Sequence, residues 1–431
     1  MVEVKNITGT KKKIFNLRVK TAVFFHFIPE LIKGNITFKK FTVFLRRLLF
    51  FLSRMQHNKF VKIEENTRVD LYVPGFPSKA FYTACKKFMV FEQKFPCTTI
   101  LISVTSACMY KCKHCYQKFD KGQDIDINIL VDTVKKLQDM GIAFFNIEGG
   151  EPFLVYDRLK KVCEAIDDRS EIWVNSTGYG ITLERLLELK ELNVTAIMFS
   201  LHCSEPEGLN EFMGNNDAWN TMQKAIDLCH EAGIAAAFNT CLQIEDFYNG
   251  TFEKVMERAS EFKAAIVQLI KPKPAGGWLE SGVKDFGEKG FIHIKNQVNK
   301  YNHDPKYKDY PSISAQILEE DKSVFGCTAG GTDRFYINAK GDLQPCEFLN
   351  ISFGNIKTDN FEAIYSKMRS CFEPPCECWL CEKYSSEILK LYRDNNLKSL
   401  PLPPGMSEEL YTGWERGEET EMYRSINDIL E

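Results

Sequence analysis

Residues 106–116 read Ser106-Ala-Cys-Met-Tyr-Lys-Cys-Lys-His-Cys-Tyr116. The stretch places three thiols, Cys108, Cys112 and Cys115, at a C-x3-C-x2-C spacing just after an apolar run at 98–103. We expect no cleavable secretory leader, because no small-residue cleavage site follows a compact apolar run. Clustered cysteines then indicate metal ligands and argue against disulfides. If the metal group is a four-iron cluster, three thiolates leave one iron open to an outside ligand. The loop therefore predicts a metal site at the end of a strand.

From residue 98 onwards, short apolar runs alternate with amphipathic stretches at intervals near 30 residues. This alternation predicts parallel β/α units, and six units predict an open, partial (β/α)6 barrel of the TIM type. The predicted strands are Thr98–Ser103, Ala143–Glu148, Glu171–Asn175, Ala196–Leu201, Ala235–Thr240 and Ala265–Ile270. The predicted helices are Ile127–Met140, Tyr156–Asp167, Leu183–Leu192, Asn215–Ala232 and Thr251–Phe262.

Short polar or glycine-rich motifs follow the later strands, where parallel β/α folds place their sites. Bare glycines after the second strand let the backbone approach a ligand closely. The motifs are Glu148-Gly-Gly-Glu-Pro152, Asn175-Ser-Thr-Gly178, Ser200-Leu-His202, Asn239-Thr240 and Lys273-Pro-Ala-Gly-Gly277. Together with the cysteine loop they predict one site at the carboxyl ends of the strands.

This set of motifs resembles the radical S-adenosylmethionine (SAM) superfamily over about residues 98–280. The resemblance implies a [4Fe-4S] cluster on Cys108, Cys112 and Cys115, SAM on the open iron, and reductive cleavage of SAM to a 5′-deoxyadenosyl radical. It also implies an electron donor such as flavodoxin or ferredoxin, and it assigns no catalytic acid or base. The residues that it implies for SAM binding are Gly149, Gly150, Glu151, Pro152, Asn175, Ser200 and Asn239.

A tetrahedral zinc ion is the alternative for the cysteine loop, with His114 as a fourth ligand. Because His114 adjoins Cys115, closing a tetrahedron around one ion is awkward. Zinc would also leave Gly149–Pro152 unexplained. Many relatives carry an aromatic residue where this chain has His114.

A second cysteine-rich pattern spans residues 327–381. Phe335–Asn338, a turn at Lys340-Gly-Asp342 and Leu343–Cys346 predict a β-hairpin, followed by a helix near 360–370. The pattern resembles the SPASM or twitch domain of radical SAM enzymes, which implies at least one auxiliary [4Fe-4S] cluster, with zinc as the alternative. The candidate ligands are Cys327, Cys346, Cys376, Cys378 and Cys381.

The chain of 431 residues has a net charge of -3, but residues 1–60 carry 13 Lys or Arg against Glu3 and Glu30. Within this basic region, residues 38–55 predict an amphipathic helix with a basic edge. Such a helix suits an anionic membrane surface, and the alternative is a helix packed on the barrel. Bulky aliphatic residues between the cations disfavour nucleic acid. We expect a cytoplasmic protein, peripheral on the cytoplasmic face of the membrane.

Four regions are predicted: a basic amphipathic helical region at 1–90, the radical SAM barrel at 91–310, the SPASM/twitch-like domain at 311–390 and a helical tail at 391–431. The predicted activity is that of a radical SAM oxidoreductase or transferase. Its radical would abstract hydrogen from an unactivated carbon of a peptide, a protein or a membrane lipid. The alternatives are a non-catalytic zinc-binding protein and a membrane-recruited assembly factor.

Overall fold

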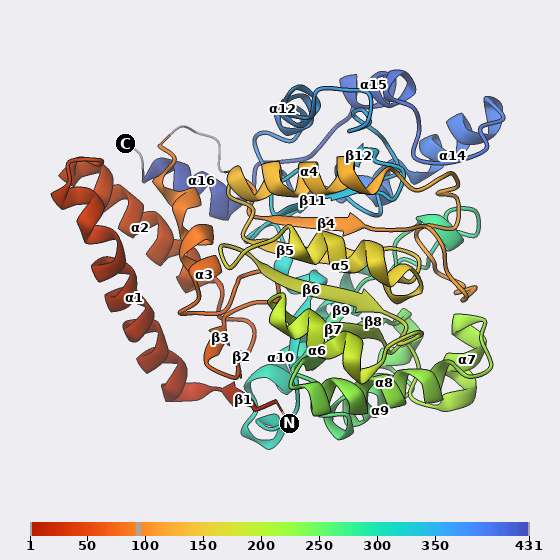
Figure 1. Cartoon of the computed structure of the whole chain (residues 1–431), viewed down its shortest axis with the longest axis horizontal. Helices are drawn as coiled ribbons and strands as arrows, with labels where there is room; N and C mark the ends of the chain where they lie inside the picture. The colour runs from red at the N-terminus through yellow and green to blue at the C-terminus, as the bar shows by residue number, and fades with distance from the viewer. Residues whose placement is uncertain (1, 92–95, 430–431) are drawn as a thin grey trace.

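The computed structural model describes residues 2–91 and 96–429. A nine-stranded sheet forms the centre of the molecule, in the order β10-β9-β8-β7-β6-β5-β4-β11-β12 (Figure 1). All neighbouring strands are parallel except β11 and β12, which form an antiparallel hairpin. The strands are β4 Thr99–Ser103, β5 Phe144–Glu148, β6 Glu171–Ser176, β7 Val194–Ser200, β8 Ala235–Cys241, β9 Ile266–Ile270, β10 Ser312–Ala315, β11 Arg334–Ile337 and β12 Leu343–Gln344.

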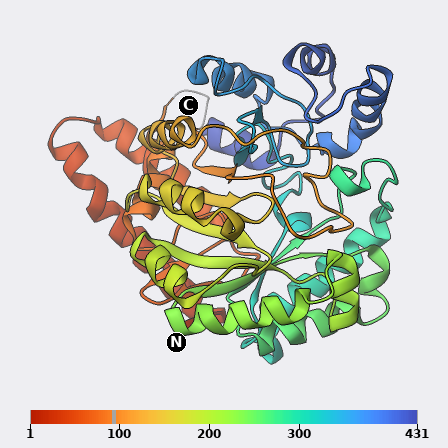
Figure 2. The same cartoon turned by 45° about the vertical axis from the view of Figure 1, so that its right-hand side comes forward.

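The helices between the strands cover the outer face of the sheet (Figures 1 and 2). Their N-termini follow the local sequence: the Asp126 side chain accepts the N–H of Asn128 at the start of α4, and Thr182 caps α6 in the same way. The predicted β/α alternation is confirmed. The helices are α4 Ile127–Asp139, α5 Tyr156–Glu164, α6 Leu183–Glu191, α7 Pro206–Met213, α8 Ala218–Ala232 and α9 Thr251–Glu261.

The partial barrel has one more parallel strand at each end than the six that the sequence predicts. β10 pairs with β9, and β11 pairs with β4 through Arg334 opposite Thr99. The predicted hairpin at 335–346 is confirmed, and its first strand belongs to the barrel sheet. The sheet therefore continues across residue 310, where the sequence places a domain boundary, and the four predicted regions stay a prediction.

Large side chains from the N-terminal region and from the strands fill the interior of the barrel near the amino-terminal ends of the strands. Phe144 and Trp173 are buried there, and the Arg68 guanidinium lies 5.1 Å and 4.6 Å from their ring centroids. Arg68 also forms a buried ion pair with Glu171 at the start of β6. Burying one such aromatic ring stabilises the fold by about 1.5–3 kcal/mol. This packing closes the barrel at the end opposite its site.

The N-terminal region has a small antiparallel sheet that the sequence does not predict, formed by β1 Val4–Ile7, β2 Phe60–Ile63 and β3 Asn66–Arg68. Three helices accompany it: α1 Gly9–Ile32, α2 Phe38–Arg54 and α3 Lys79–Cys85. Among the described residues, no helix combines the length and the apolar character needed to cross a membrane.

The helix predicted at 38–55 is present as α2, but most of its apolar face is buried inside the protein. Phe44, Leu48 and Phe51 pack in an N-terminal core that also includes residues of α1 and of α16 (Glu421–Asp428) but no described residue of the barrel strands. The helix is therefore buried in this core and not on the barrel, where the alternative from the sequence expected it. One cation of the predicted basic edge, Arg47, is also buried, and its Nε donates to the carbonyl of Ile426 at 3.2 Å. α2 therefore presents only its remaining edge to the outside.

The C-terminal part lies on the side of the sheet where β4 and β11 pair, and it then returns to the N-terminal helices (Figure 1). The helix predicted near 360–370 is confirmed as α12, and α16 packs against α2. The remaining helices are α10 Gly287–His303, α11 Gln316–Glu319, α12 Phe361–Cys371, α13 Leu380–Lys383, α14 Ser385–Asp394, α15 Pro404–Thr412 and α16 Glu421–Asp428.

Candidate active site

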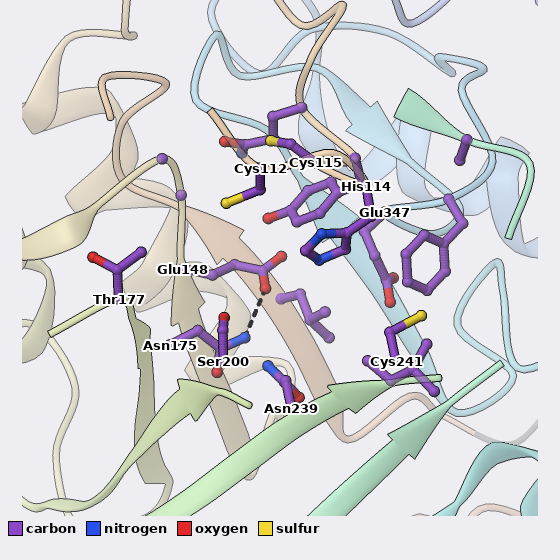
Figure 3. A pocket seen from close by; sticks show the side chains of 18 of the residues that line it. Cys112, His114, Cys115, Glu148, Asn175, Thr177, Ser200, Asn239, Cys241 and Glu347 are labelled. Carbon is purple, nitrogen blue, oxygen red and sulfur yellow. Dashed lines mark hydrogen bonds between the residues drawn. The ribbon is translucent and has the colours of Figure 1, made fainter. Parts of the chain in front are cut away.

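A cavity of about 330 Å³ opens at the carboxyl ends of the barrel strands (Figure 3). The structure brings most of the predicted site residues to its wall, although they come from five different strand ends. Two predicted residues, Glu151 and Pro152, are buried beneath the wall and do not line the cavity. The predicted residues in the wall are Cys108, Cys112, Cys115, Gly149, Gly150, Asn175, Ser200 and Asn239.

The cysteine loop is held in place by backbone hydrogen bonds from three neighbouring segments. The N–H of Gly150 donates to the carbonyl of Thr105 at 2.7 Å, and the N–H of Gly277 donates to the carbonyl of Cys115 at 2.9 Å. On the third side, the N–H of Lys111 donates to the carbonyl of Met213 at 3.0 Å. The thiols therefore sit on a rigid frame built from the ends of β5, β9 and α7.

The glycines of the motifs make room for the backbone of this loop. A Cβ on Gly150 would lie 2.2 Å from the carbonyl oxygen of Ala107, and one on Gly277 would lie 2.0 Å from that of Lys113. Both distances are far below van der Waals contact. The expectation that bare glycines serve the approach of a ligand is therefore incomplete, because at these two positions the close neighbour is the cysteine loop itself.

The carboxylate of Glu151 accepts hydrogen bonds from groups of the protein itself. Its two oxygens accept hydrogen bonds from the N–H of Phe153, the hydroxyl of Ser176 and the N–H of Thr177, at 3.0, 2.8 and 2.7 Å. Burial raises the pKa of Glu151, and the bond from the Thr177 side chain opposes that shift. The residue thus fixes the turn after β6 to the turn after β5, and this network has no counterpart in the sequence prediction.

His114 lies in an aromatic group above the cavity. Its ring centroid is 4.4 Å from that of His202 and 4.9 Å from that of Phe212. Burial lowers the pKa of His114 to about 4, so the ring is neutral. A flat neutral ring packed in this way acts as a wall of the cavity.

The spacing of the three thiols tests the zinc alternative. A tetrahedral zinc ion with Zn–S distances of about 2.3 Å holds its sulfur ligands roughly 3.8 Å apart. Within residues 2–91 and 96–429, the one group of three or more His, Cys, Asp and Glu whose ligand atoms lie within 4.8 Å of one another is His57, Asp70 and Glu319. The three thiols do not form such a group, so at least two of their sulfur atoms lie more than 4.8 Å apart, a spacing that fits a cluster of several atoms better than one ion.

Unpaired polar atoms around the cavity show that its natural occupant is polar. Buried donors and acceptors in folded proteins almost always have partners, so a group of orphaned atoms facing one space indicates a ligand that supplies them. SAM carries an amino group, a carboxylate, two ribose hydroxyls and an adenine, and so fits this wall. The Tyr116 hydroxyl and the Glu148 carboxylate are hydrogen-bonded to each other. The orphaned atoms are Nδ1 of His114, Oε1 of Gln117, Oδ1 of Asn146, Oδ1 of Asn175, Nε2 of His202 and Oδ1 of Asn239.

Two carboxylates in the cavity were not assigned by sequence reasoning. Glu148, the last residue of β5, accepts a hydrogen bond of 3.0 Å from the Asn175 amide and points into the cavity, with Glu347 on the opposite wall (Figure 3). Burial, and secondly the charge of Glu347, raise the pKa of Glu148 to about 8. Its position at a strand end next to the Gly-Gly turn is the signal that could have identified it.

A second, smaller cavity lies beside the first and brings three of the predicted auxiliary cysteines together: Cys327, Cys346 and Cys381. Cys376 and Cys378 do not line it, although the N–H of Cys327 donates to the carbonyl of Cys376 at 2.9 Å. The wall between the two cavities contains Lys273, which faces both and forms an ion pair of 3.1 Å with Glu382.

Comparison with known proteins agrees with this arrangement. The family model of the radical SAM superfamily matches residues 102–259, and that of the SPASM iron–sulfur cluster-binding domain matches residues 327–382. The AdoMet-dependent heme synthase of Nitratidesulfovibrio vulgaris is 22% identical over 294 residues, which cover 63% of this chain and 79% of the relative. A probable GTP 3′,8-cyclase of Archaeoglobus fulgidus is 24% identical, over 59% of this chain and 86% of the relative.

Among solved structures, Streptococcus suis SuiB bound to the precursor peptide SuiA superposes with a TM-score of 0.53 and 15% identity. The match covers 68% of this chain and 73% of SuiB. SuiB bound to S-adenosylmethionine superposes with the same TM-score. At this identity the likeness establishes the fold alone.

A partial barrel with a three-cysteine loop over a polar cavity, followed by a cysteine-rich hairpin, defines an iron–sulfur enzyme that uses SAM. The chain belongs to the radical SAM superfamily and carries a SPASM-type auxiliary domain. Its cofactors are SAM and [4Fe-4S] clusters, one at the radical SAM site and at least one in the auxiliary domain. The two non-catalytic alternatives drawn from the sequence are therefore set aside.

Proposed function

We propose that this enzyme abstracts a hydrogen atom from an unactivated carbon of a peptide substrate. The observation that carries the proposal is the cavity beneath the cysteine loop, whose wall presents orphaned polar atoms from five strand ends. When bound and reduced, the cluster and SAM supply the 5′-deoxyadenosyl radical that makes such an abstraction feasible. The chain's own residues hold, orient and shield the reacting groups.

In this proposal the thiolates of Cys108, Cys112 and Cys115 hold the radical SAM cluster. The wall atoms of Asn175, Ser200 and Asn239, with the backbone of Gly149 and Gly150, bind SAM. Glu151 and Pro152 contribute indirectly, because Glu151 fixes the two turns that carry the binding atoms. His114, His202 and Phe212 keep water from the loop side of the cavity.

We propose Cys327, Cys346 and Cys381 as ligands of one auxiliary cluster, because the three thiols share a cavity. The fourth ligand in this assignment is Cys376, since its carbonyl is already tied to the N–H of Cys327. Cys378 is the less favoured candidate, because it lines a separate hollow on the surface beside Lys383. Held by these residues, a cluster would supply an electron acceptor beside the SAM cavity, because the two cavities share Lys273 and Phe348 in their walls.

A peptide is favoured over a lipid as the substrate by the shape and polarity of the cavity. Among the described residues of the first 90, only Tyr72 lines it, so the N-terminal helices do not lead into it. The wall carries amides and the carboxylates of Glu148 and Glu347, which suit a polar chain. SuiB, the structural neighbour, binds a precursor peptide, which supports the same choice by analogy.

The second candidate is a membrane lipid, favoured by the basic, partly apolar N-terminal region. Under this alternative the lipid would have to reach the cavity without passing along α1 or α2. We retain it only as the competing outcome of the experiment described below.

The electron donor in the proposal is a small carrier such as flavodoxin or ferredoxin, which reaches the cysteine loop from outside. Lys111 and Lys118 are exposed on this loop. Cations there complement an acidic carrier surface and steer its approach. We expect electron transfer from such a carrier to slow as the salt concentration rises.

Anaerobic assays with dithionite, SAM and extracts of the source cells test the proposal. Reconstituted enzyme should form 5′-deoxyadenosine, and the peptide fraction of a deletion strain should acquire a mass change when the enzyme is added. A mass change confined to the lipid fraction would establish the second candidate. If no 5′-deoxyadenosine formed, the assignment of the cavity would be wrong.

A further inference from the structure

The helix α1 has two apolar faces, and only one of them is buried. Phe15, Val19, Val23 and Phe27 point into the N-terminal core. On the opposite face, Ile14, Leu17 and Phe25 are each 65% exposed and Ile32 is 77% exposed. At 3.6 residues per turn, the exposed side chains fall within an arc of about 100° along the whole helix. The second face is therefore a continuous apolar stripe.

Cations border the stripe on both sides. Lys11 and Arg18 lie on one flank, Lys13 and Lys20 on the other, and all four are exposed. From Gly9 to Pro29 the helix has no Asp or Glu. At the start of α2, Phe38 is also 71% exposed and is followed by the exposed Lys39 and Lys40. An apolar ridge between two rows of cations is the pattern of a helix that lies in a membrane interface.

Exposed apolar side chains are concentrated on α1 and the start of α2, which ordinary surface composition does not explain. Six of the thirteen large exposed apolar side chains among the described residues lie between Ile14 and Phe38. The other seven are scattered singly over the barrel and its loops. Scattered apolar residues are normal on a soluble surface, whereas a contiguous patch marks an interaction site.

We propose that α1 is an in-plane anchor that binds the enzyme to an anionic membrane surface. The apolar stripe would enter the boundary between headgroups and acyl chains, and the flanking cations would contact lipid phosphates. A second copy of the chain would cover the stripe less favourably than a membrane, because packing two stripes together would bring their rows of cations into repulsive contact.

The position of α1 determines which way the SAM cavity faces when the enzyme is docked on a membrane. α1 forms one edge of the molecule, and the arrowheads of β4 and β6 point toward the opposite edge (Figures 1 and 2). Docking on α1 therefore turns the mouth of the SAM cavity away from the bilayer. An enzyme held in this way receives its substrate and its electron donor from the aqueous side.

Vesicle flotation of the full-length, cluster-loaded enzyme tests the anchor. It should float with phosphatidylcholine–phosphatidylglycerol vesicles and stay in the soluble fraction with pure phosphatidylcholine. The double variant Leu17→Asp, Phe25→Asp should lose at least tenfold in partitioning. Each of Lys13→Gln and Lys20→Gln should lose roughly fivefold, the effect expected for one cation at an anionic surface.

Two substitutions on distant helices are the matched controls. Leu187→Asp on α6 and Lys135→Gln on α4 change the same residue types at exposed positions and should float like the wild type. All variants should form 5′-deoxyadenosine without vesicles at the wild-type rate, which shows that they are folded. Equal flotation of the Leu17→Asp, Phe25→Asp variant and the wild type would overturn the proposal, as would stripe-dependent dimerisation without vesicle binding.

Discussion

Glu151 and Thr177 are joined by a hydrogen bond of 2.7 Å from the Thr177 backbone N–H to the Glu151 carboxylate. The bond connects the Gly-Gly-Glu-Pro turn after β5 with the turn after β6, where Glu151 is buried and Thr177 lines the cavity. It makes the glutamate of the motif a support for the atoms that face the ligand. The geometry of the site thus depends on a residue that does not line it.

Replacing Glu151 tests this support. Glu151→Gln keeps the size of the side chain but replaces one carboxylate oxygen with an NH2 group, which cannot accept a hydrogen bond. The donors that now bind the carboxylate therefore lose hydrogen bonds to a charged acceptor. We expect the free energy of unfolding to fall by about 2–3 kcal/mol and the KM for SAM to rise. Thermal unfolding and 5′-deoxyadenosine assays measure the two effects. The exposed Glu184→Gln serves as control, and an unchanged stability of Glu151→Gln would show that the network contributes nothing.

The glycine contacts predict a selective loss of iron. In Gly150→Ala the new Cβ meets the Ala107 carbonyl at 2.2 Å, so the cysteine loop must move. We expect the first cluster to be lost while iron in the auxiliary domain is retained, as measured by iron analysis after anaerobic reconstitution. Gly405→Ala, where no atom lies within 4 Å of the new Cβ, should keep full iron. Full iron in Gly150→Ala would contradict the role given to the close contact.

The auxiliary site predicts a difference between two cysteines that are close in sequence. Cys381 shares a cavity with Cys327 and Cys346, whereas Cys371 at the end of α12 lies outside it. Cys381→Ala should therefore lower the iron content of the auxiliary domain, and Cys371→Ala should leave it unchanged. Mössbauer spectra of both variants distinguish the sites. Equal iron loss in the two variants would place the cluster elsewhere.

Stability should fall as the pH rises from about 6.5 to 8. His57 lies 3.9 Å from both Asp70 and Glu319. These carboxylates and hydrogen bonding raise the pKa of His57 against an opposing effect of burial, and burial raises that of Asp70 to about 8. A protonated His57 and a neutral Asp70 are both favoured by folding, so both contributions are present at low pH and lost as the groups deprotonate.

The pH dependence of the melting temperature measures this effect. The wild type should melt at a lower temperature at pH 8 than at pH 6.5. Asp70→Asn removes one titrating group and should flatten the slope between these values. Because the pKa of Glu319 is lowered, its contribution changes only in the acidic range. A wild-type melting temperature that rises between pH 6.5 and 8 would contradict the assignment.

The alternating barrel core was predictable because its signals are local. Apolar strands such as β6 and helices such as α4 end within a few residues of their predicted limits. β10 and β11 were not predicted as barrel strands, since each has only four residues and its place depends on pairing with a distant strand. The sequence contains no local mark of that pairing.

The site was predictable to the extent that its residues follow strand ends. The cysteines and the residues Asn175, Ser200 and Asn239 meet in one cavity as expected from that rule. The supporting role of Glu151 beneath the cavity was not predictable, because the direction of a side chain after a turn depends on tertiary packing. The stripe on α1 was also missed, since a helix that is apolar on two faces shows little amphipathic contrast.

The most direct test of the central claim is the electron paramagnetic resonance spectrum of the dithionite-reduced enzyme with and without SAM. If Cys108, Cys112 and Cys115 hold a cluster with an open iron, SAM should change the signal of the wild type. Cys112→Ala should lose that SAM-dependent signal and keep the signal of the auxiliary domain. A wild-type spectrum unaffected by SAM, or a Cys112→Ala enzyme that still responds to SAM, would contradict the account.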